Sequence, residues 1–279
     1  MTEEWTPKAT RFDSYIFWMD ILNTHPEKLN NFKLGDNPKT YYKDWTGSDC
    51  KICHGMEYVQ LKGTEHEVFC FCSTLRWMEH QWLQNSYFQT LHQPAKLEDL
   101  IPISVPDENA AKDLRRLKEY LTKWIIYPKE WIWIQGGFGC GKSHILKSIN
   151  TALPIASIYI SSEDFQSKLF AARDQTNGVQ ILQDGLSSVP ILLFDDWGLE
   201  YSKSDWTTTS FANIINSRNQ FPKQYITVVT SNLASTELKS SGDVKIRRIV
   251  DRLTDVNIAT LWQLRQASFR SGQTQGKIK

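Results

Sequence analysis

Residues 131–143 read WIWIQGGFGCGKS, and this stretch decides the class of fold. Its first four residues are aromatic or β-branched, which predicts a short buried strand. The remainder, from Gly136 to Ser143, matches the pattern G-x-x-x-x-G-K-[ST] in full. Residues 143–153 then show the apolar spacing of a helix. A strand, a glycine-rich loop and a helix in this order predict a phosphate-binding loop in an α/β protein.

The residue types of this loop suit nucleotide phosphates. Glycines let backbone N–H groups converge on phosphate oxygens, and the helix N-terminus adds partial positive charge. We expect Lys142 to reach the β- and γ-phosphates and the Ser143 hydroxyl to bind Mg2+. Cys140 occupies a variable position, where we expect a small space-filling residue rather than a redox role. The residues predicted to bind ATP are Gly136, Gly137, Phe138, Gly139, Cys140, Gly141, Lys142, Ser143 and His144.

Two further apolar strands are predicted to end in polar side chains. Residues 189–194 run into Asp195 and Asp196, which is the Walker B pattern. We expect Asp195 to hold Mg2+, directly or through water, and Asp196 to polarise the attacking water. Residues 225–229 lead to Asn232, which either orients that water and contacts the γ-phosphate or caps the next turn.

Four of the five cysteines form a Cys-x-x-Cys pair and a Cys-x-Cys pair, sixteen residues apart. No secretory signal is visible at the N-terminus, which predicts a reducing compartment, and two thiolate pairs suit tetrahedral Zn2+. The residues between the pairs predict a turn and a short hairpin. Four reduced cysteines or an iron–sulfur cluster are the alternatives, with His54 and His66 as substitute ligands. The predicted ligands of a structural, non-catalytic zinc are Cys50, Cys53, Cys70 and Cys72.

Composition and charge bound the class of protein. Hydrophobic residues make up 41% and charged residues 23%, which is the balance of a soluble globular chain and excludes disorder throughout. No run of 18 apolar residues occurs, so we expect a cytoplasmic protein without a membrane span. The last 39 residues hold eight Lys and Arg against three Asp and Glu. Such a tail fits either a phosphate-rich partner or a solvated charged surface.

Two domains are expected. Residues 1–100 are predicted to form a small zinc-binding, partner-binding domain, with helices over 11–33 and 73–92. Prolines then break the helical pattern. Residues 101–279 are predicted to form the nucleotide-binding domain, which opens on a helix over 108–127.

A series of motifs follows in order between about residue 100 and residue 270. After the two Walker motifs come an N-x-x-N-S-R segment ending at Arg218, T-S-N-L, R-I-V-D-R-L from Arg248, and S-F-R ending at Arg270. This series resembles the AAA+ ATPases of the DnaC/DnaI/IstB group, the replicative helicase loaders and related transposition helpers. The D-D-x-G form of Walker B is similar to the DnaI side of the group. The upstream cysteines resemble the zinc-binding N-terminal domain of such loaders, and the fold implied is an AAA+ P-loop NTPase with a parallel central sheet.

The resemblance implies roles for matching positions. Asn232 matches the sensor 1 residue, and Arg252, with Arg248 second, matches an arginine finger given to a neighbouring subunit. Arg270 matches a C-terminal arginine that acts like sensor 2. Trans arginines suit this chemistry because the transition state spreads charge over the γ-phosphoryl oxygens. Asp196 replaces the glutamate of many AAA+ sites, as in DnaI-like members, and the alternative role for each arginine is a surface charge.

The function implied by the resemblance is an ATP-dependent loader. It would bind a replicative helicase and single-stranded DNA, assemble with ATP into a homo-oligomer, and hydrolyse ATP at the subunit interface. One alternative is a transposition helper that forms ATP-dependent filaments on duplex DNA and recruits a transposase. Another is a weakly hydrolysing, nucleotide-dependent scaffold. The N-terminal cysteine module favours the loader.

Overall fold

The structure is a computed structural model, and the chain divides into two compact units. One comprises Met1–Gln84 with Ile126–Pro128 and Pro154–Ala156, and the other Asn85–Ile125 with Lys129–Leu153 and Ser157–Lys279. Little of the predicted helices over 11–33 and 73–92 lies within the described part of the chain. The structure describes residues 14, 18, 53, 56, 58–60, 67–70, 72–74, 92–100, 108–126, 128–153, 157–198, 205–265 and 268.

The described part of the first unit centres on a hairpin. Strands β1 (Tyr58–Gln60) and β2 (Glu67–Phe69) pair in antiparallel fashion, which confirms the short hairpin predicted between the cysteine pairs. Two helical residues, Ser14 and Trp18, hydrogen-bond to the end of β2. The backbone N–H of Phe69 donates to Ser14 Oγ at 2.9 Å, and Trp18 Nε1 donates to the Phe69 carbonyl at 2.8 Å. These bonds fix the backbone immediately before Cys70.

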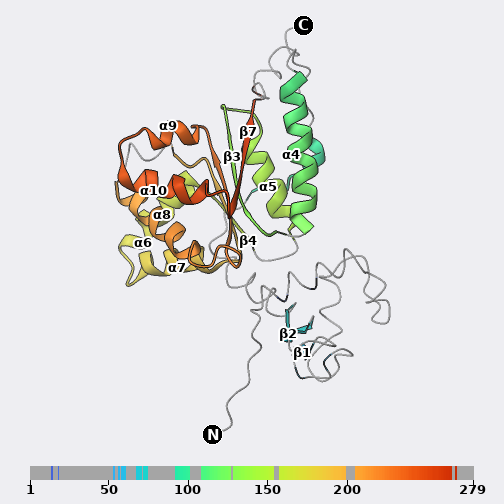
Figure 1. Cartoon of the computed structure of the whole chain (residues 1–279). Coiled ribbons are helices and arrows are strands. Elements are labelled where there is room, and N and C mark those ends of the chain that lie inside the picture. Colours follow the sequence, from blue (N-terminus) through green and yellow to red (C-terminus); the bar gives the residue numbers. More distant parts are fainter. Residues whose placement is uncertain are drawn as a thin grey trace. The chain divides into compact units, whose positions relative to one another are not determined.

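Five parallel strands form the sheet of the second unit, in the spatial order β4-β5-β6-β3-β7 (Figure 1). Every residue of β3, β5 and β6 is buried, as expected for parallel strands covered on both faces. The predicted α/β fold with a parallel sheet is confirmed. The strands are β3 (Trp131–Gly136), β4 (Ser157–Ser161), β5 (Ile191–Asp195), β6 (Ile226–Ser231) and β7 (Ala259–Leu264).

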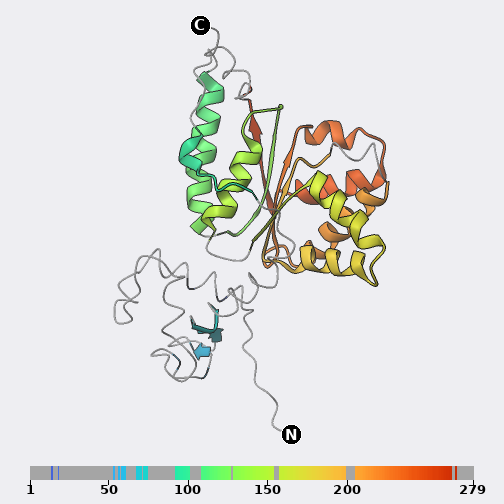
Figure 2. The ribbon, with the colours of Figure 1, turned by 180° about the vertical axis from the view of Figure 1, so that it is seen from behind.

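Helices cover both faces of this sheet (Figures 1 and 2). One face carries α4 (Glu108–Ile126) and α5 (Lys142–Ala152), and the short 3-10 helix η5 (Leu97–Asp99) precedes α4. The direction of the strand connections explains the division, because the β3-to-β4 crossover runs opposite to the later ones and right-handed crossovers then use opposite faces. The other face carries α6 (Ser162–Arg173), α7 (Gly178–Ser188), α8 (Asp205–Arg218), α9 (Ser235–Lys239) and α10 (Val244–Leu253).

Helix α4 confirms the helix predicted over 108–127. Its buried side chains include Leu114, Leu117, Leu121 and Trp124, which recur at the spacing of one helix face. Most of the remaining positions carry charged residues. Among the described residues, no helix combines the length and the apolar character needed to cross a membrane.

An aromatic cluster fills the space between the sheet and the helices α6 and α8. The rings of Phe194 and Phe211 lie 4.3 Å apart between centroids, and Trp197 lies 5.5 Å from Phe211. Trp133 of β3 contacts Trp197 edge to face at 5.7 Å. Trp197, two residues beyond Asp195, is therefore anchored in this cluster. Its packing limits how far the end of β5 moves.

Arg218, the last residue of α8, is a fully buried cation at the amino end of the sheet. Its guanidinium caps the carbonyl end of α7 and reaches the chain entering β5 and β6. Burial lowers its pKa to about 9, so it stays protonated at neutral pH. Its acceptors are the carbonyls of Leu186 (2.9 Å), Ser187 (3.2 Å), Val189 (2.8 Å), Pro190 (3.4 Å) and Ile226 (2.5 Å), and Thr227 Oγ1 (2.9 Å).

Candidate nucleotide-binding site

The glycine-rich loop connects β3 to α5 and depends on two left-handed glycines. Gly139 has φ +74° and Gly141, the N-cap of α5, has φ +96°. A Cβ on Gly139 would also overlap the side chain of Ser268, and one on Gly136 would lie 2.6 Å from the Leu264 carbonyl oxygen. The loop is thus shaped by its own backbone and by the chain that follows β7.

Lys142 lies across this loop with its ammonium group enclosed. Its side chain is buried, with 4% exposed, and Nζ donates to the carbonyls of Gly136 and Gly137, both at 2.8 Å. A third bond, of 2.7 Å, goes to Asn232 Oδ1. These three acceptors use all three donors of the ammonium group.

A cavity of about 320 Å³ opens beside the loop, which is within the usual range for small-molecule sites. Its wall combines the loop and the first turn of α5 with polar residues that follow β5 and β6. The sequence pattern placed these groups far apart along the chain, and the parallel sheet brings their ends to one edge. The wall comprises Asp99, Leu100, Phe138, Gly139, Gly141, Lys142, Ser143, His144, Asp196 and Asn232.

Four residues predicted for this site are not part of the cavity wall, namely Gly136, Gly137, Cys140 and Asp195. The two glycines contribute through the carbonyls that hold Lys142. The Cys140 thiol is buried 3.7 Å from Lys142 Nζ, and burial raises its pKa. A buried, protonated thiol fills space and is a poor nucleophile.

Asp195 ends β5 with both carboxylate oxygens hydrogen-bonded. Oδ1 accepts from Thr230 Oγ1 at 2.5 Å, and Oδ2 accepts from the Tyr159 hydroxyl at 2.8 Å. Thr230 Oγ1 in turn accepts the backbone N–H of Asp196 at 2.9 Å. The carboxylate is therefore fixed between strands β4 and β6.

Asp196 reaches the cavity because its backbone turns sharply. Its φ is +58°, a left-handed conformation that is uncommon outside glycine and asparagine. Its carbonyl accepts from Ser162 Oγ at 3.1 Å, and its Oδ1 accepts from Asn232 Nδ2 at 2.9 Å. Since the other end of the same amide accepts from Lys142, Asn232 joins the cation to the carboxylate.

Asp99 and Leu100 line the cavity although no local sequence motif predicts them. They belong to the segment 92–100, which α5 and α4 hold in place. His144 Nε2 donates to the Lys96 carbonyl at 2.8 Å, and Lys118 Nζ donates to the Leu100 carbonyl at 2.8 Å. Only the place of this segment, ahead of the helix α4 that precedes β3, could have pointed to it.

Arg248 and Arg252 lie one turn apart on α10, away from the helix face that Ile246, Ile249 and Val250 bury. Arg252 donates to the Arg248 carbonyl at 3.0 Å, and neither arginine belongs to the cavity wall of its own chain. Arg270 lies outside the described residues.

The oxygen ligands around the cavity suit a magnesium ion. Mg2+ prefers hard oxygen ligands, and the Ser143 hydroxyl and the Asp196 carboxylate share the cavity wall. Asp195, the residue before Asp196, supplies a second carboxylate, which is not part of that wall.

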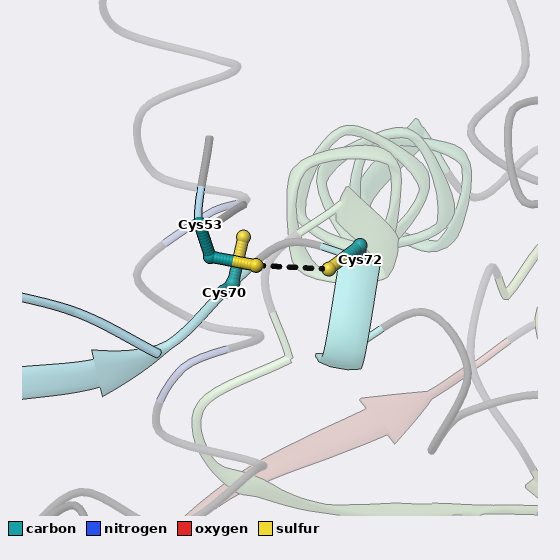
Figure 3. A group of neighbouring side chains, drawn as sticks. All are labelled: Cys53, Cys70 and Cys72. Atoms are coloured by element: carbon teal, nitrogen blue, oxygen red, sulfur yellow. Dashed lines mark hydrogen bonds between the residues drawn. The ribbon is translucent and has the colours of Figure 1, made fainter. Parts of the chain in front are cut away.

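Three cysteines of the first unit converge on one point (Figure 3). The Sγ atoms of Cys53, Cys70 and Cys72 all lie within 4.8 Å of one another, and all three residues are buried. The Cys53 and Cys72 sulfurs are 3.6 Å apart, too far for a disulfide. Thiolates around tetrahedral zinc at about 2.3 Å stand about 3.8 Å apart, so the spacing suits a metal. Cys50, His54 and His66 lie outside the described residues.

The chain matches no model of a protein family and no curated protein. Many solved structures are similar to it, and three of them illustrate the likeness. DnaI is 21% identical, with a TM-score of 0.48 over 64% of this chain and 95% of that chain. The DnaC helicase loader is 21% identical, with a TM-score of 0.49 over 61% of this chain and 97% of that chain. AMPPCP-bound DnaA from Aquifex aeolicus is 23% identical, with a TM-score of 0.48 over 68% of this chain and 56% of that chain.

Over these stretches the chain is similar in fold to DnaI and to the DnaC helicase loader.

Proposed function

We propose that the chain is an AAA+ ATPase that binds ATP with Mg2+ in this cavity and hydrolyses it. The observation that carries the proposal is the hydrogen-bonded series Lys142–Asn232–Asp196 beside the loop. It joins a cation for phosphate oxygens, an amide for the γ-phosphate and a carboxylate that can orient water. Attack by that water on the γ-phosphorus breaks its bond to the bridging oxygen and yields ADP and phosphate.

Lys142 is held in place by weak partners that a nucleotide can replace. Two of its three acceptors are uncharged loop carbonyls, whereas phosphate oxygens carry negative charge and accept stronger hydrogen bonds. Magnesium, when bound, neutralises phosphate charge, and Ser143, Asp195 and Asp196 are the residues that would hold it.

The site is completed by a second copy of the chain in this proposal. Arg252 and Arg248 are turned away from their own domain core on α10. Arginines in that position can reach the phosphates bound by a neighbouring copy, where they would stabilise the charge of the transition state.

Mixed variants test the shared site. We expect Arg252→Ala to bind ATP within about twofold of wild type and to hydrolyse it at least about 100-fold more slowly. Mixing it with Lys142→Ala should restore part of the phosphate release, because one chain supplies the arginine and the other the loop. Arg173→Ala, which removes an exposed arginine on α6, is the control. A chain that sediments as a monomer with saturating ATP analogue and single-stranded DNA would contradict the shared site.

The ATPase acts, we further propose, as a loader of a replicative helicase onto single-stranded DNA. The cysteine cluster in a unit separate from the nucleotide site supports this assignment, because it offers a partner-binding module. Capture of native partners by the ATP-bound chain tests it. A hexameric helicase is expected, and capture of a transposase together with filaments on duplex DNA would replace the loader by a transposition helper.

The cluster binds one structural zinc in this proposal, with Cys50 as the fourth ligand. We expect elemental analysis to find one zinc per chain and Cys72→Ser to lose it, because three thiolates do not close the shell. Cys140→Ser removes a buried cysteine of the other unit and should keep the metal. Absence of metal from the wild-type protein, or iron in its place, would contradict the assignment.

A further inference from the structure

Tyr159 contacts the nucleotide site from a strand that supplies none of the predicted site residues. It lies on β4, next to β5, and is buried. Its hydroxyl donates to Asp195 Oδ2 at 2.8 Å. Because an ionised carboxylate only accepts hydrogen bonds, the tyrosine hydroxyl is the donor of this bond.

The hydroxyl is one of two that hold Asp195 from opposite sides. Thr230 on β6 donates to Oδ1, and Tyr159 on β4 donates to Oδ2. Each carboxylate oxygen accepts one of these bonds and retains a second lone pair. The carboxylate plane is thus set by two strands that flank its own.

The ring of Tyr159 is itself fixed by two neighbouring elements, the segment 92–100 and α5. His92 meets it edge to face, with centroids 4.9 Å apart, and Lys147 Nζ of α5 lies 5.6 Å from its centroid. His92 Nε2 accepts from Asn150 Nδ2 at 2.8 Å, and Asn150 Oδ1 accepts from Ser157 Oγ at 2.8 Å. The ring therefore contacts the segment 92–100, whose last residues line the cavity.

We propose that Tyr159 is a positioning residue for magnesium, whose hydroxyl orients the Asp195 carboxylate toward the metal that accompanies ATP. The inference rests on the proposed ATP site and adds to it a residue outside the recognised motifs. Partners behind a metal-binding carboxylate fix its direction, and their loss commonly weakens metal binding by about 10- to 100-fold.

The test compares nucleotide binding with and without magnesium. Binding of a fluorescent, non-hydrolysable ATP analogue is measured in EDTA and then across a Mg2+ titration. We expect Tyr159→Phe to bind the analogue in EDTA within about twofold of wild type, because Lys142 and the loop are untouched. The Mg2+ midpoint, which is the Mg2+ concentration at half of the change in binding, should rise about tenfold in this variant.

Tyr120→Phe is the matched control. Tyr120 also has a hydroxyl that donates to a carboxylate, Glu130 Oε1, at 2.9 Å. It contacts Trp262 of β7 and does not belong to the cavity wall. We expect a wild-type Mg2+ midpoint for this variant, so a shift specific to Tyr159 is not a general effect of losing a buried hydroxyl.

A double-mutant cycle shows whether Tyr159 acts through Asp195. In an Asp195→Asn background, Tyr159→Phe should cause no further rise of the midpoint, since the group it orients is gone. Tyr159→Met also lacks a donor and, being flexible, fills the space differently. It should share the midpoint of the Phe variant, and it replaces that variant if the latter does not fold.

Three outcomes separate the inference from the proposed function. A folded Tyr159→Phe with an unchanged midpoint would overturn the positioning role. A lower midpoint would overturn it too, because the hydroxyl would then compete with the metal for Oδ2. Wild-type protein that binds no analogue at any Mg2+ concentration would instead remove the proposed ATP site.

Discussion

Lys142 and Arg218 are buried cations near opposite ends of the same sheet, and main-chain carbonyls surround both. Lys142 bonds to a glycine-rich loop beside a cavity, with three rotatable donors on a flexible stem. Arg218 bonds to the end of α7 and to the starts of two strands through a planar fork. The comparison shows that the location of the acceptors, more than the charge of the side chain, distinguishes a ligand site from a structural anchor.

The difference also has an energetic side. Replacing Lys142 frees carbonyls beside a cavity that water can enter, whereas replacing Arg218 leaves carbonyls in the interior without donors. A buried polar group that loses its partner costs about 1–3 kcal/mol. Arg218 satisfies several such groups at once. Replacing Arg218 should therefore lower the stability of the fold, whereas replacing Lys142 should lower the affinity for ATP and leave stability nearly unchanged.

Arg218→Met should produce the largest effect and should act on stability. We expect the free energy of unfolding to fall by about 4 kcal/mol, because the methionine fills part of the volume but donates no hydrogen bond. Chemical denaturation followed by tryptophan fluorescence measures the loss. Arg173→Met, at an exposed position, should change stability by less than about 0.5 kcal/mol. If the two variants were equally stable, Arg218 would not anchor the amino end of the sheet.

Lys142→Ala should act on binding and spare the fold. We expect the affinity for ATP to fall at least about 100-fold, because the loop amides alone do not neutralise the β- and γ-phosphates. The unfolding midpoint should stay close to that of wild type. Lys123→Ala, on the exposed side of α4, should retain wild-type affinity in the same titration calorimetry. Undiminished affinity of the Lys142 variant would place the nucleotide elsewhere.

Asn232→Ala should have the smallest effect on binding. It removes one neutral hydrogen-bond partner of Lys142, worth about 1 kcal/mol, so we expect about a fivefold loss of ATP affinity. Hydrolysis should fall further, because the same amide holds Asp196. Asn216→Ala, exposed on α8, controls for the loss of an amide. Equal losses in affinity and in rate would show that Asn232 serves binding alone.

The sequence was sufficient where a function resides in consecutive residues. The loop from Gly136 to Ser143 and the strands leading to Asp195 and Asn232 carry their signals locally, and the parallel sheet confirmed their setting. The role of Arg218 was not predictable from its motif, because its acceptors come from two separate stretches, 186–190 and 226–227. The same holds for Tyr159, whose partner lies on another strand.

The pair Asp195 and Asp196 shows a finer limit. The pattern of an apolar strand ending in two acids predicts a metal ligand and a water-polarising residue. It does not predict that Asp195 lies behind the cavity wall while Asp196 reaches it. That division depends on the left-handed backbone of Asp196, which the Thr230 and Ser162 side chains support. Aspartate adopts this conformation more often than most residues do, but too rarely for the sequence to predict it here.

The position of β3 in the sheet has a consequence for synthesis on the ribosome. Both of its neighbours, β6 and β7, come later in the chain, and Gln135 bonds to Gln263, 128 residues away. While β7 is still inside the ribosome, β3, which leads into the glycine-rich loop, lacks one of its two neighbouring strands. Pairings so distant in sequence also form late. We therefore expect stalled chains ending before residue 259 to capture no ATP analogue. In the cell, nucleotide would then reach the protein only after translation of the second unit is nearly complete.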